Sequence, residues 1–308
     1  MSWQYLGRVP ETKPTVVVLT ALPSEFMAVR KHLKDTEVLE HRKGTLVERG
    51  RLPDSAWHVA VAELGAGAQN AAALTERIVD WLDPEALLFV GVAGGLQDDI
   101  ALGDVVVGTK VYGIHGGKQT PEGFQVRPEA WRSSYRLEQA ARFALRDLPV
   151  HFKPIAVGDV VLADAESAIA AYLRLHYNDA AAIETEGSGV AHAAHLSDGL
   201  DALVIRGIGN HADAGKPEAD TSGSQPQAAE RAAEALVAVL RRLQPFRGRS
   251  SGSGSGDSEE GPHGGSTPTY GDRGPTYGGG HYDFRGSTFN GPFVAKQVGR
   301  ERREDDRR

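Results

Sequence analysis

The 308-residue chain contains no cysteine. This absence excludes disulfide bonds, thiolate zinc sites and cysteine nucleophiles, and it is typical of a protein from a reducing cytoplasm. The chain also lacks an excess of positive charge, because its formal net charge is −7. A net negative charge does not favour nucleic-acid binding. The sequence therefore predicts a cytoplasmic protein that does not bind nucleic acid.

Long apolar runs are also missing from the sequence. No segment approaches about 18 consecutive apolar residues, the length that a membrane-spanning helix needs. Residues 1–13 contain no apolar core of a signal peptide. We therefore expect a soluble protein without a membrane partner.

Metal-binding spacings are absent among the eleven histidines. The segments IHGGK and AHAAH differ from HExxH, in which two histidines one helical turn apart hold zinc. We expect neither a metal nor a cofactor.

From Thr15 to about Gln244 the chain alternates between strand-like and helix-like segments. Strands are expected at residues 15–20, 57–64, 86–96, 104–113, 154–164, 180–186 and 203–209. Helices are expected at 24–33, 129–147 and 226–243, and Ser24 is the expected N-cap of the first. Three more are expected with less defined bounds: one that ends near residue 82, one between 164 and 180, and a short one after 186. This alternation predicts a three-layer α/β/α sandwich around a mixed central β-sheet.

The composition changes after residue 247. Residues 248–282 consist largely of Gly, Ser and Pro and cannot bury enough apolar surface to offset chain entropy, so they predict a disordered linker. Residues 283–308 contain a short β-prone motif and a charged tail. We therefore divide the chain into one α/β domain at 1–247, a linker and a terminal motif.

Two acidic residues, Glu184 and Glu186, end the apolar segment AAIETE. In an extended strand, side chains two residues apart point to the same face, so both would line one surface with Thr185 opposite. Alternatively, both acids simply reach solvent at a strand end. Arg206, in the apolar segment LVIRGIG, needs a partner because an unpaired buried charge costs several kcal/mol. A carboxylate of the 184/186 pair would satisfy it.

Two further features are open to a structural or a functional interpretation. Glu25 begins a helix, where the helix dipole alone favours an acid. The glycine-rich segments GVAGG (91–95) and LGAG (64–67) match neither a P-loop nor a GxGxxG motif, and tight strand-to-helix turns explain them. In an α/β sheet, however, ligands bind at the carboxyl ends of strands. Glu25, Gly94, Glu184, Glu186 and Asn210 all follow such ends.

Taken together, the motifs resemble a known family. In order along the chain they are ALPSE (21–25), LGAGAQNAAA (64–73), VGVAGGL (90–96), LGDVVV (102–107), VGDVV (157–161), IETEGSGVAH (183–192) and VIRGIGNHAD (204–213). This series is similar to the nucleoside phosphorylase superfamily, closest to its methylthioadenosine/S-adenosylhomocysteine nucleosidase branch. The resemblance covers roughly residues 15–243. It implies cleavage of the N-glycosidic bond between ribose and a purine, by a homo-oligomer.

The resemblance also implies roles for individual residues. Glu25 would hold and polarise the attacking water, and Glu186 would accept hydrogen bonds from the ribose 2′ and 3′ hydroxyls. Carboxylates suit this chemistry because they stabilise an oxocarbenium-like sugar. Supporting positions would be Glu184 and Arg206 beside these carboxylates, Ala93 and Gly94 near the ribose or nucleophile, Val161 and Leu162 in the base pocket, and Asp159 nearby.

This chain departs from the family pattern at two positions. The family's general acid is an Asp, and here Asn210 occupies its position. An amide can hydrogen-bond a purine but cannot donate a full proton, and losing general acid catalysis typically costs about 10²–10⁴-fold in rate. In trimeric members of the family, an Asn at the base accompanies a preference for 6-oxopurines. Thr185 replaces the Met that usually packs on the ribose, which indicates a different substrate.

Three functions are therefore compatible with the sequence. Hydrolysis is favoured over phosphorolysis, because ALPSE and FVGVAGG contain no arginine for phosphate and Val92 replaces a residue that often carries a hydroxyl. A phosphate-dependent purine nucleoside phosphorylase in salvage is the first alternative. A catalytically weak purine-binding sensor or scaffold is the second.

The C-terminal segment HYDFRGSTFNGPFVAKQVG resembles short motifs of bacterial signalling and defence proteins, some of which are thought to form amyloid-like stacks. The segments STFNG and FVAKQV are β-prone, and Asn290 and Gln297 could form side-chain ladders. Pro292 argues against one uninterrupted strand. The motif at 283–299 indicates that the chain binds a signalling partner and acts as an effector that depletes purine nucleosides or nucleotides. Alternatively, this segment is a disordered tail without such a role.

Overall fold

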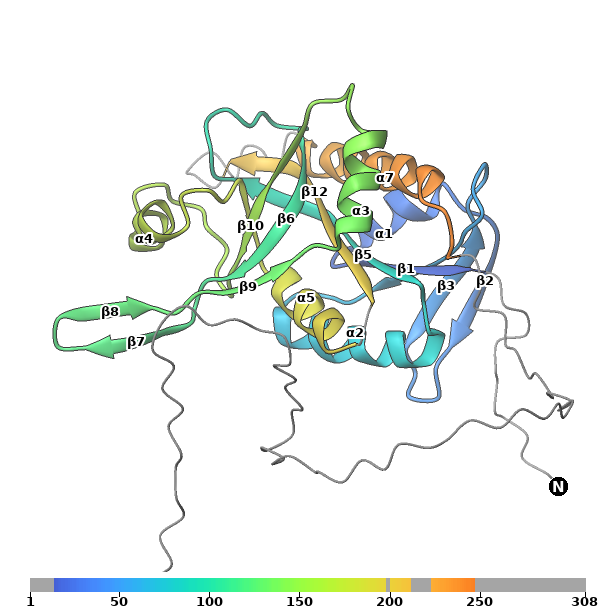
Figure 1. Ribbon diagram of the computed structural model, residues 1–308, viewed down its shortest axis with the longest axis horizontal. Helices are drawn as coiled ribbons and strands as arrows, with labels where there is room; N and C mark the ends of the chain where they lie inside the picture. Colours follow the sequence, from blue (N-terminus) through green and yellow to red (C-terminus); the bar gives the residue numbers. More distant parts are fainter. Residues whose placement is uncertain (1–13, 198–199, 212–222, 247–308) are drawn as a thin grey trace, which may run out of the picture. The chain divides into compact units, whose positions relative to one another are not determined.

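The computed structural model describes residues 14–197, 200–211 and 223–246, which form the α/β assembly in Figure 1. The linker and the β-prone motif that we expect at 248–282 and 283–308 lie outside the described residues. Within the described part of the chain, no helix has both the length and the apolar character needed to cross a membrane.

The central sheet contains most of the strands. They are β1 (Thr15–Thr20), β2 (Lys34–Glu40), β3 (Leu46–Arg51), β4 (His58–Glu63), β5 (Ala86–Gly95), β6 (Val105–Gly113), β9 (Glu129–Arg132), β10 (Val150–Val157), β11 (Ala182–Glu184) and β12 (Asp201–His211). A separate hairpin joins β7 (Gly117–Thr120) to β8 (Gly123–Val126). The helices are α1 (Pro23–Arg30), α2 (Ala68–Leu82), α3 (Tyr135–Ala144), α4 (Ala168–His176), α5 (Gly187–Leu196) and α7 (Ser224–Arg242).

The strand order is β11-β10-β6-β12-β5-β1-β4-β3-β2, and β9 pairs with β6. The sheet is mixed: β1 lies parallel to β4 and β5, whereas β12 is parallel to β5 and antiparallel to β6. β11 pairs with β10 and also, antiparallel, with β5. These pairings gather the ends of β5, β11 and β12.

Strand β1 shows why helices cover both faces of the sheet. Its side chains alternate, so Val16 and Val18 belong to one buried core and Val17 and Leu19 to the other. The first core includes residues of α1, α3 and α7, and the second includes residues of α2 and α5. Figure 1 shows the two groups of helices on opposite sides of the sheet. The predicted three-layer sandwich with a mixed sheet is confirmed.

Several predicted boundaries were wrong. The helix expected at 129–147 is shorter, because residues 129–132 pair with β6 and Ser134 caps α3 by accepting the N–H of Leu137. The strand expected at 154–164 ends at Val157. Strands β2 and β3 were missed for related reasons. β2 is largely charged and exposed, and β3 buries only Val47 and Gly50, so neither shows the alternation that reveals a half-buried strand.

Candidate active site

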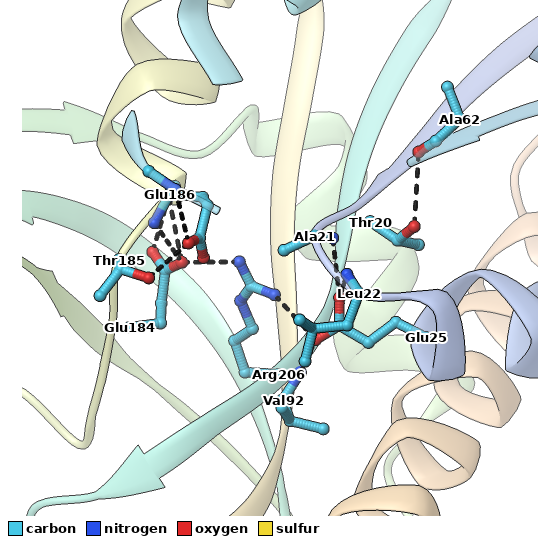
Figure 2. Close-up of polar contacts among 12 residues, drawn as sticks. Thr20, Ala21, Leu22, Glu25, Ala62, Val92, Glu184, Thr185, Glu186 and Arg206 are labelled. Atoms are coloured by element: carbon cyan, nitrogen blue, oxygen red, sulfur yellow. Dashed lines mark hydrogen bonds and ion pairs between the residues drawn. The ribbon is translucent and has the colours of Figure 1, made fainter. Parts of the chain in front are cut away.

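A buried cluster of charges lies where β1, β5, β11 and β12 meet (Figure 2). Nη2 of Arg206 donates to Oε2 of Glu184 at 2.7 Å, and Nη1 lies 4.0 Å from Oε1 of Glu25. The exposed fraction of these residues is 1% for Arg206, 2% for Glu25 and 7% for Glu184. A buried guanidinium needs such partners. The expectation that a carboxylate of the 184/186 pair is the partner of Arg206 is confirmed, and the buried Nε of Arg206 has no hydrogen-bond partner among the described residues.

Two residues that the sequence reasoning missed shape the space around Arg206. Its guanidinium carbon stacks 3.8 Å from the centre of the Phe89 ring, a favourable cation–π contact. A Cβ at Gly91 would lie 2.2 Å from Nη1 of Arg206 and 2.3 Å from Oε1 of Glu25. A side chain there would displace the buried ion pair, so glycine at 91 makes room for Arg206 and Glu25. The tight turn expected at 91–95 was wrong, because these residues belong to β5.

Glu25 lies in the first turn of α1, and backbone groups surround its carboxylate. Oε2 accepts the N–H groups of Ala21 at 2.8 Å and Leu22 at 3.0 Å, and Oε1 accepts the N–H of Val92 at 2.7 Å. Because a carboxylate oxygen accepts about two hydrogen bonds, one acceptor direction remains on Oε1.

The start of α1 differs from the expectation. Leu22 is the N-cap, so Ser24 is not. Pro23 follows at the first helical position, where its fixed φ suits a helix start and its missing N–H costs nothing. Glu25, the third residue of the helix, accepts the N–H of the N-cap residue Leu22 and that of Ala21 before it.

Glu184 ends β11 and organises the chain that follows. Its carboxylate accepts the N–H of Glu186 at 3.0 Å and that of Gly187 at 2.8 Å, at the first turn of α5. Burial raises the pKa of the Glu184 carboxyl, while Arg206 and the two backbone donors favour its charged form. Glu184 thus connects Arg206 to the start of α5.

The prediction that Glu184 and Glu186 share one strand face was wrong. β11 ends at Glu184, and Glu186 is the N-cap of α5 with φ −118° and ψ −32°, so the period of two does not continue. Oε1 of Glu186 accepts the N–H of Gly67 at 3.0 Å and the hydroxyl of Thr185. Glu184 therefore contacts Arg206 (Figure 2), whereas Glu186 contacts Gly67 at the start of α2.

Asn210 lies near the end of β12, after an irregularity in its pairing with β5. It is 6% exposed and pairs with Gly94, which also pairs with Ile183 of β11. Ala93 precedes this glycine and is 5% exposed. The predicted residues therefore lie together at the carboxyl-terminal ends of β5, β11 and β12.

The predicted base-pocket residues lie apart from the charged cluster. Val161 is 59% exposed, and Leu162 is buried in a small core with Ile114 and Tyr177. Leu162 also lines a cavity of about 880 Å³ together with Gly95 and His211, the sequence neighbours of Gly94 and Asn210.

Asp159 lies on the same exposed turn as Val161, where its N–H donates to Nε2 of His115 at 2.8 Å. Among the residues that the structure describes, no three His, Asp or Glu side chains are grouped to hold a metal ion.

Comparison with known proteins gives related sequences. The model of the phosphorylase superfamily matches residues 15–243. ATP nucleosidase Cap17 from Escherichia coli is 27% identical over 250 residues, which cover 67% of this chain and 48% of that protein. This chain therefore spans about half the length of that relative. A 5′-methylthioadenosine/S-adenosylhomocysteine nucleosidase from an Exiguobacterium species is 29% identical over 242 residues, covering 74% of this chain and 98% of that protein.

Solved structures with the same fold include two further enzymes. The 5′-methylthioadenosine/S-adenosylhomocysteine nucleosidase of S. pneumoniae, bound to a transition-state inhibitor, has a TM-score of 0.66 at 25% identity and covers 75% of this chain and 100% of its own. Futalosine hydrolase of Helicobacter pylori has a TM-score of 0.66 at 20% identity and covers 75% of this chain and 99% of its own. At this identity, the second likeness concerns the fold alone.

Proposed function

The chain belongs to the phosphorylase superfamily, and from this premise we propose that residues 15–243 cleave the N-glycosidic bond of a purine nucleoside or nucleotide by attack of water. The observation that carries this proposal is the cluster of Glu25, Glu184 and Arg206 with Glu186 beside it, at the ends of adjacent strands. Glu25 and Glu184 flank the guanidinium of Arg206 and Glu186 lies two residues after Glu184, and this excess of carboxylates favours a substrate that becomes positively charged. A ribose losing its base does so, because its transition state resembles an oxocarbenium ion.

Each side chain has a role in this scheme. Glu25 holds the attacking water through the acceptor direction left on Oε1. Its other directions accept backbone N–H groups, which suits orienting a water better than deprotonating it. Arg206 is a positioning residue, because Glu184 and Phe89 hold its guanidinium beside Glu25.

The sugar and the base are bound by other groups. Glu186 accepts a ribose hydroxyl, with Ala93 and Gly94 bringing backbone close to the ribose. Asn210 hydrogen-bonds the base, and Leu162 offers it an apolar contact in the cavity that Gly95 and His211 also line. Because an amide donates no full proton, the departing purine takes its proton from solvent. The attacking water, once bonded to the sugar carbon, releases one proton to solvent, so the number of protons balances.

Hydrolysis is supported over phosphorolysis by the groups around Glu25. Among the described residues, the hydrogen-bond donors to its carboxylate are backbone N–H groups, and Arg206 is paired with Glu184 and stacked on Phe89. A phosphate ion is usually clamped by arginine side chains that are free to form paired hydrogen bonds with it. The nucleosidases among the relatives support the same choice.

The full chain is expected to release free purine from at least one of adenosine, inosine, methylthioadenosine, S-adenosylhomocysteine, AMP and ATP. Chromatography of reactions with and without phosphate measures this release. Release that requires phosphate and forms ribose 1-phosphate would establish the phosphorylase alternative. Binding without any release would support the sensor alternative and contradict the proposed hydrolysis.

We also propose that the chain forms a homo-oligomer and that residues 283–299 recruit it to a signalling partner. The β-prone sequence of that segment supports the recruitment, and the multimeric character of the resembling family supports the oligomer. Sedimentation of the full chain and of a chain ending at residue 282 tests both. Concentration-dependent assembly beyond the oligomer of the domain is expected to be lost in the shorter chain, and identical sedimentation would contradict the role of the motif. A monomeric shorter chain would contradict an oligomer formed by the domain.

A further inference from the structure

The two oxygens of the Glu186 carboxylate have different surroundings. Oε1 accepts both the backbone N–H of Gly67 and the hydroxyl of Thr185, and among the described residues both donors to this carboxylate use that oxygen. An oxygen of a carboxylate accepts about two hydrogen bonds, so two donors fill the capacity of Oε1. Oε2 is the oxygen that keeps acceptor capacity for a ligand.

From this asymmetry we infer that Thr185 is a positioning residue, whose hydroxyl fixes Oε1 of Glu186 and leaves Oε2 as the single acceptor for the sugar. A single oxygen can lie well in line with only one of the two cis O–H groups, so recognition of a ribose then depends mainly on that hydroxyl. In a symmetric clamp, each carboxylate oxygen would accept one hydroxyl. The inference rests on the proposed function and specifies how that site selects its sugar.

The backbone donor to Oε1 is held rigidly. Gly67 has φ +98°, a conformation that residues other than glycine rarely adopt, and it is the N-cap of α2. Helices α2 and α5 approach closely here, because a Cβ at Gly189 would lie only 2.0 Å from the carbonyl oxygen of Ala68. This contact fixes the start of α5, which carries Glu186, against the start of α2.

The hydroxyl of Thr185 is the second donor to Oε1 of Glu186, beside the rigidly held N–H of Gly67. Thr185 lies between Glu184, which is anchored to Arg206, and Glu186 at the helix N-cap. Its hydroxyl therefore reaches the neighbouring carboxylate from a backbone that is held on both sides. A side chain without a donor at this position would leave the carboxylate with the Gly67 N–H alone and free to rotate.

Thr185→Val tests the inference, because it replaces the hydroxyl by a methyl group of similar size. Thr185→Ser keeps the hydroxyl and serves as the rescue variant. Thr75→Val is the matched control, since Thr75 is fully buried on α2 and its hydroxyl has no partner among the described residues. For each full-length variant, kcat, KM and a calorimetric Kd are measured with a ribonucleoside and with its 2′-deoxy and 3′-deoxy analogues.

In the wild type, loss of one hydroxyl is expected to lower kcat/KM by about 10- to 100-fold, the contribution of a hydrogen bond to a charged group, and loss of the other to change it little. Thr185→Val is expected to lower kcat/KM for the ribonucleoside by about ten-fold and to reduce the difference between the two deoxy analogues. Thr185→Ser and Thr75→Val are expected to keep the wild-type pattern.

Three results would overturn the inference: equal losses for both hydroxyls in the wild type, a Thr185→Val variant that matches the wild type, or failure of Thr185→Ser to restore the preference. If the wild type binds the ribonucleoside but releases no base, the proposed hydrolysis fails, and the same comparison of Kd values still decides the role of Thr185. If no ribonucleoside binds, both fail.

Discussion

Replacing Glu186 by alanine is expected to lower kcat/KM for base release by about 10²–10³-fold, the usual cost of removing one group that stabilises charge in the transition state. The carboxylate is 6% exposed and anchored on one side by Gly67 and Thr185, so its remaining oxygen can meet a sugar without reorganising. Its negative charge matters most when the sugar becomes positive. The measurement is steady-state base release with the best substrate of the panel.

Glu186→Gln is the matched variant, because it keeps the shape of the side chain and removes its charge. We expect it to lose nearly as much kcat as Glu186→Ala and to keep more of the substrate affinity. Circular dichroism and thermal unfolding separate lost catalysis from lost folding. Wild-type rates in a folded Glu186→Gln variant would contradict the proposed role of the charge.

Asn210→Asp is expected to raise kcat by about 10²-fold, the lower end of what general acid catalysis contributes. Asn210 lies beside Gly94 near the end of β12, where the resemblance places the group that contacts the leaving base. An amide there can only hydrogen-bond the purine, whereas a protonated carboxyl can transfer a proton to it. The substitution replaces the side-chain NH₂ group by an oxygen of similar volume, so the packing around residue 210 should persist.

The pH profile of Asn210→Asp distinguishes acid catalysis from a packing effect. A general acid works only while protonated, so kcat of this variant should fall as pH rises through the pKa of the new carboxyl, and the wild type should lack that decline. Relative rates on adenosine and inosine report whether the exchange also changes base preference. A slower variant with a flat pH profile would show that Asn210 does not occupy the acid position.

Much of the fold could be predicted from local pattern. Alternation of apolar runs with amphipathic segments predicted the α/β sandwich, since a strand buried on both faces, such as β1, carries consecutive apolar residues, here Val16 to Leu19. The family resemblance, which rested on short motifs spread over the same region, is confirmed by the superfamily match to residues 15–243. β2 was missed because its stabilisation comes from pairing with β3, which leaves no apolar alternation in its own sequence.

The candidate site was only partly predictable. Arg206 within an apolar strand demanded a buried carboxylate, and the structure supplies Glu184 at 2.7 Å. The spacing of Glu184 and Glu186 suggested one shared face, but the strand ended between them and α5 began. A period of two holds only while the backbone stays extended, and an N-cap residue redirects the chain.

The sequence by itself determined which residue types are present for the chemistry and which are missing: buried acids, an isolated arginine, and an amide where the family has an acid. The tertiary structure decided which of these side chains contact one another. Glu184 pairs with Arg206, backbone donors hold Glu25, and Glu186 turns to Gly67 and Thr185. These partners come from segments as much as 119 residues apart in the chain, as for Gly67 and Glu186. Such contacts depend on which strands pair and how closely helices approach, which no local pattern records.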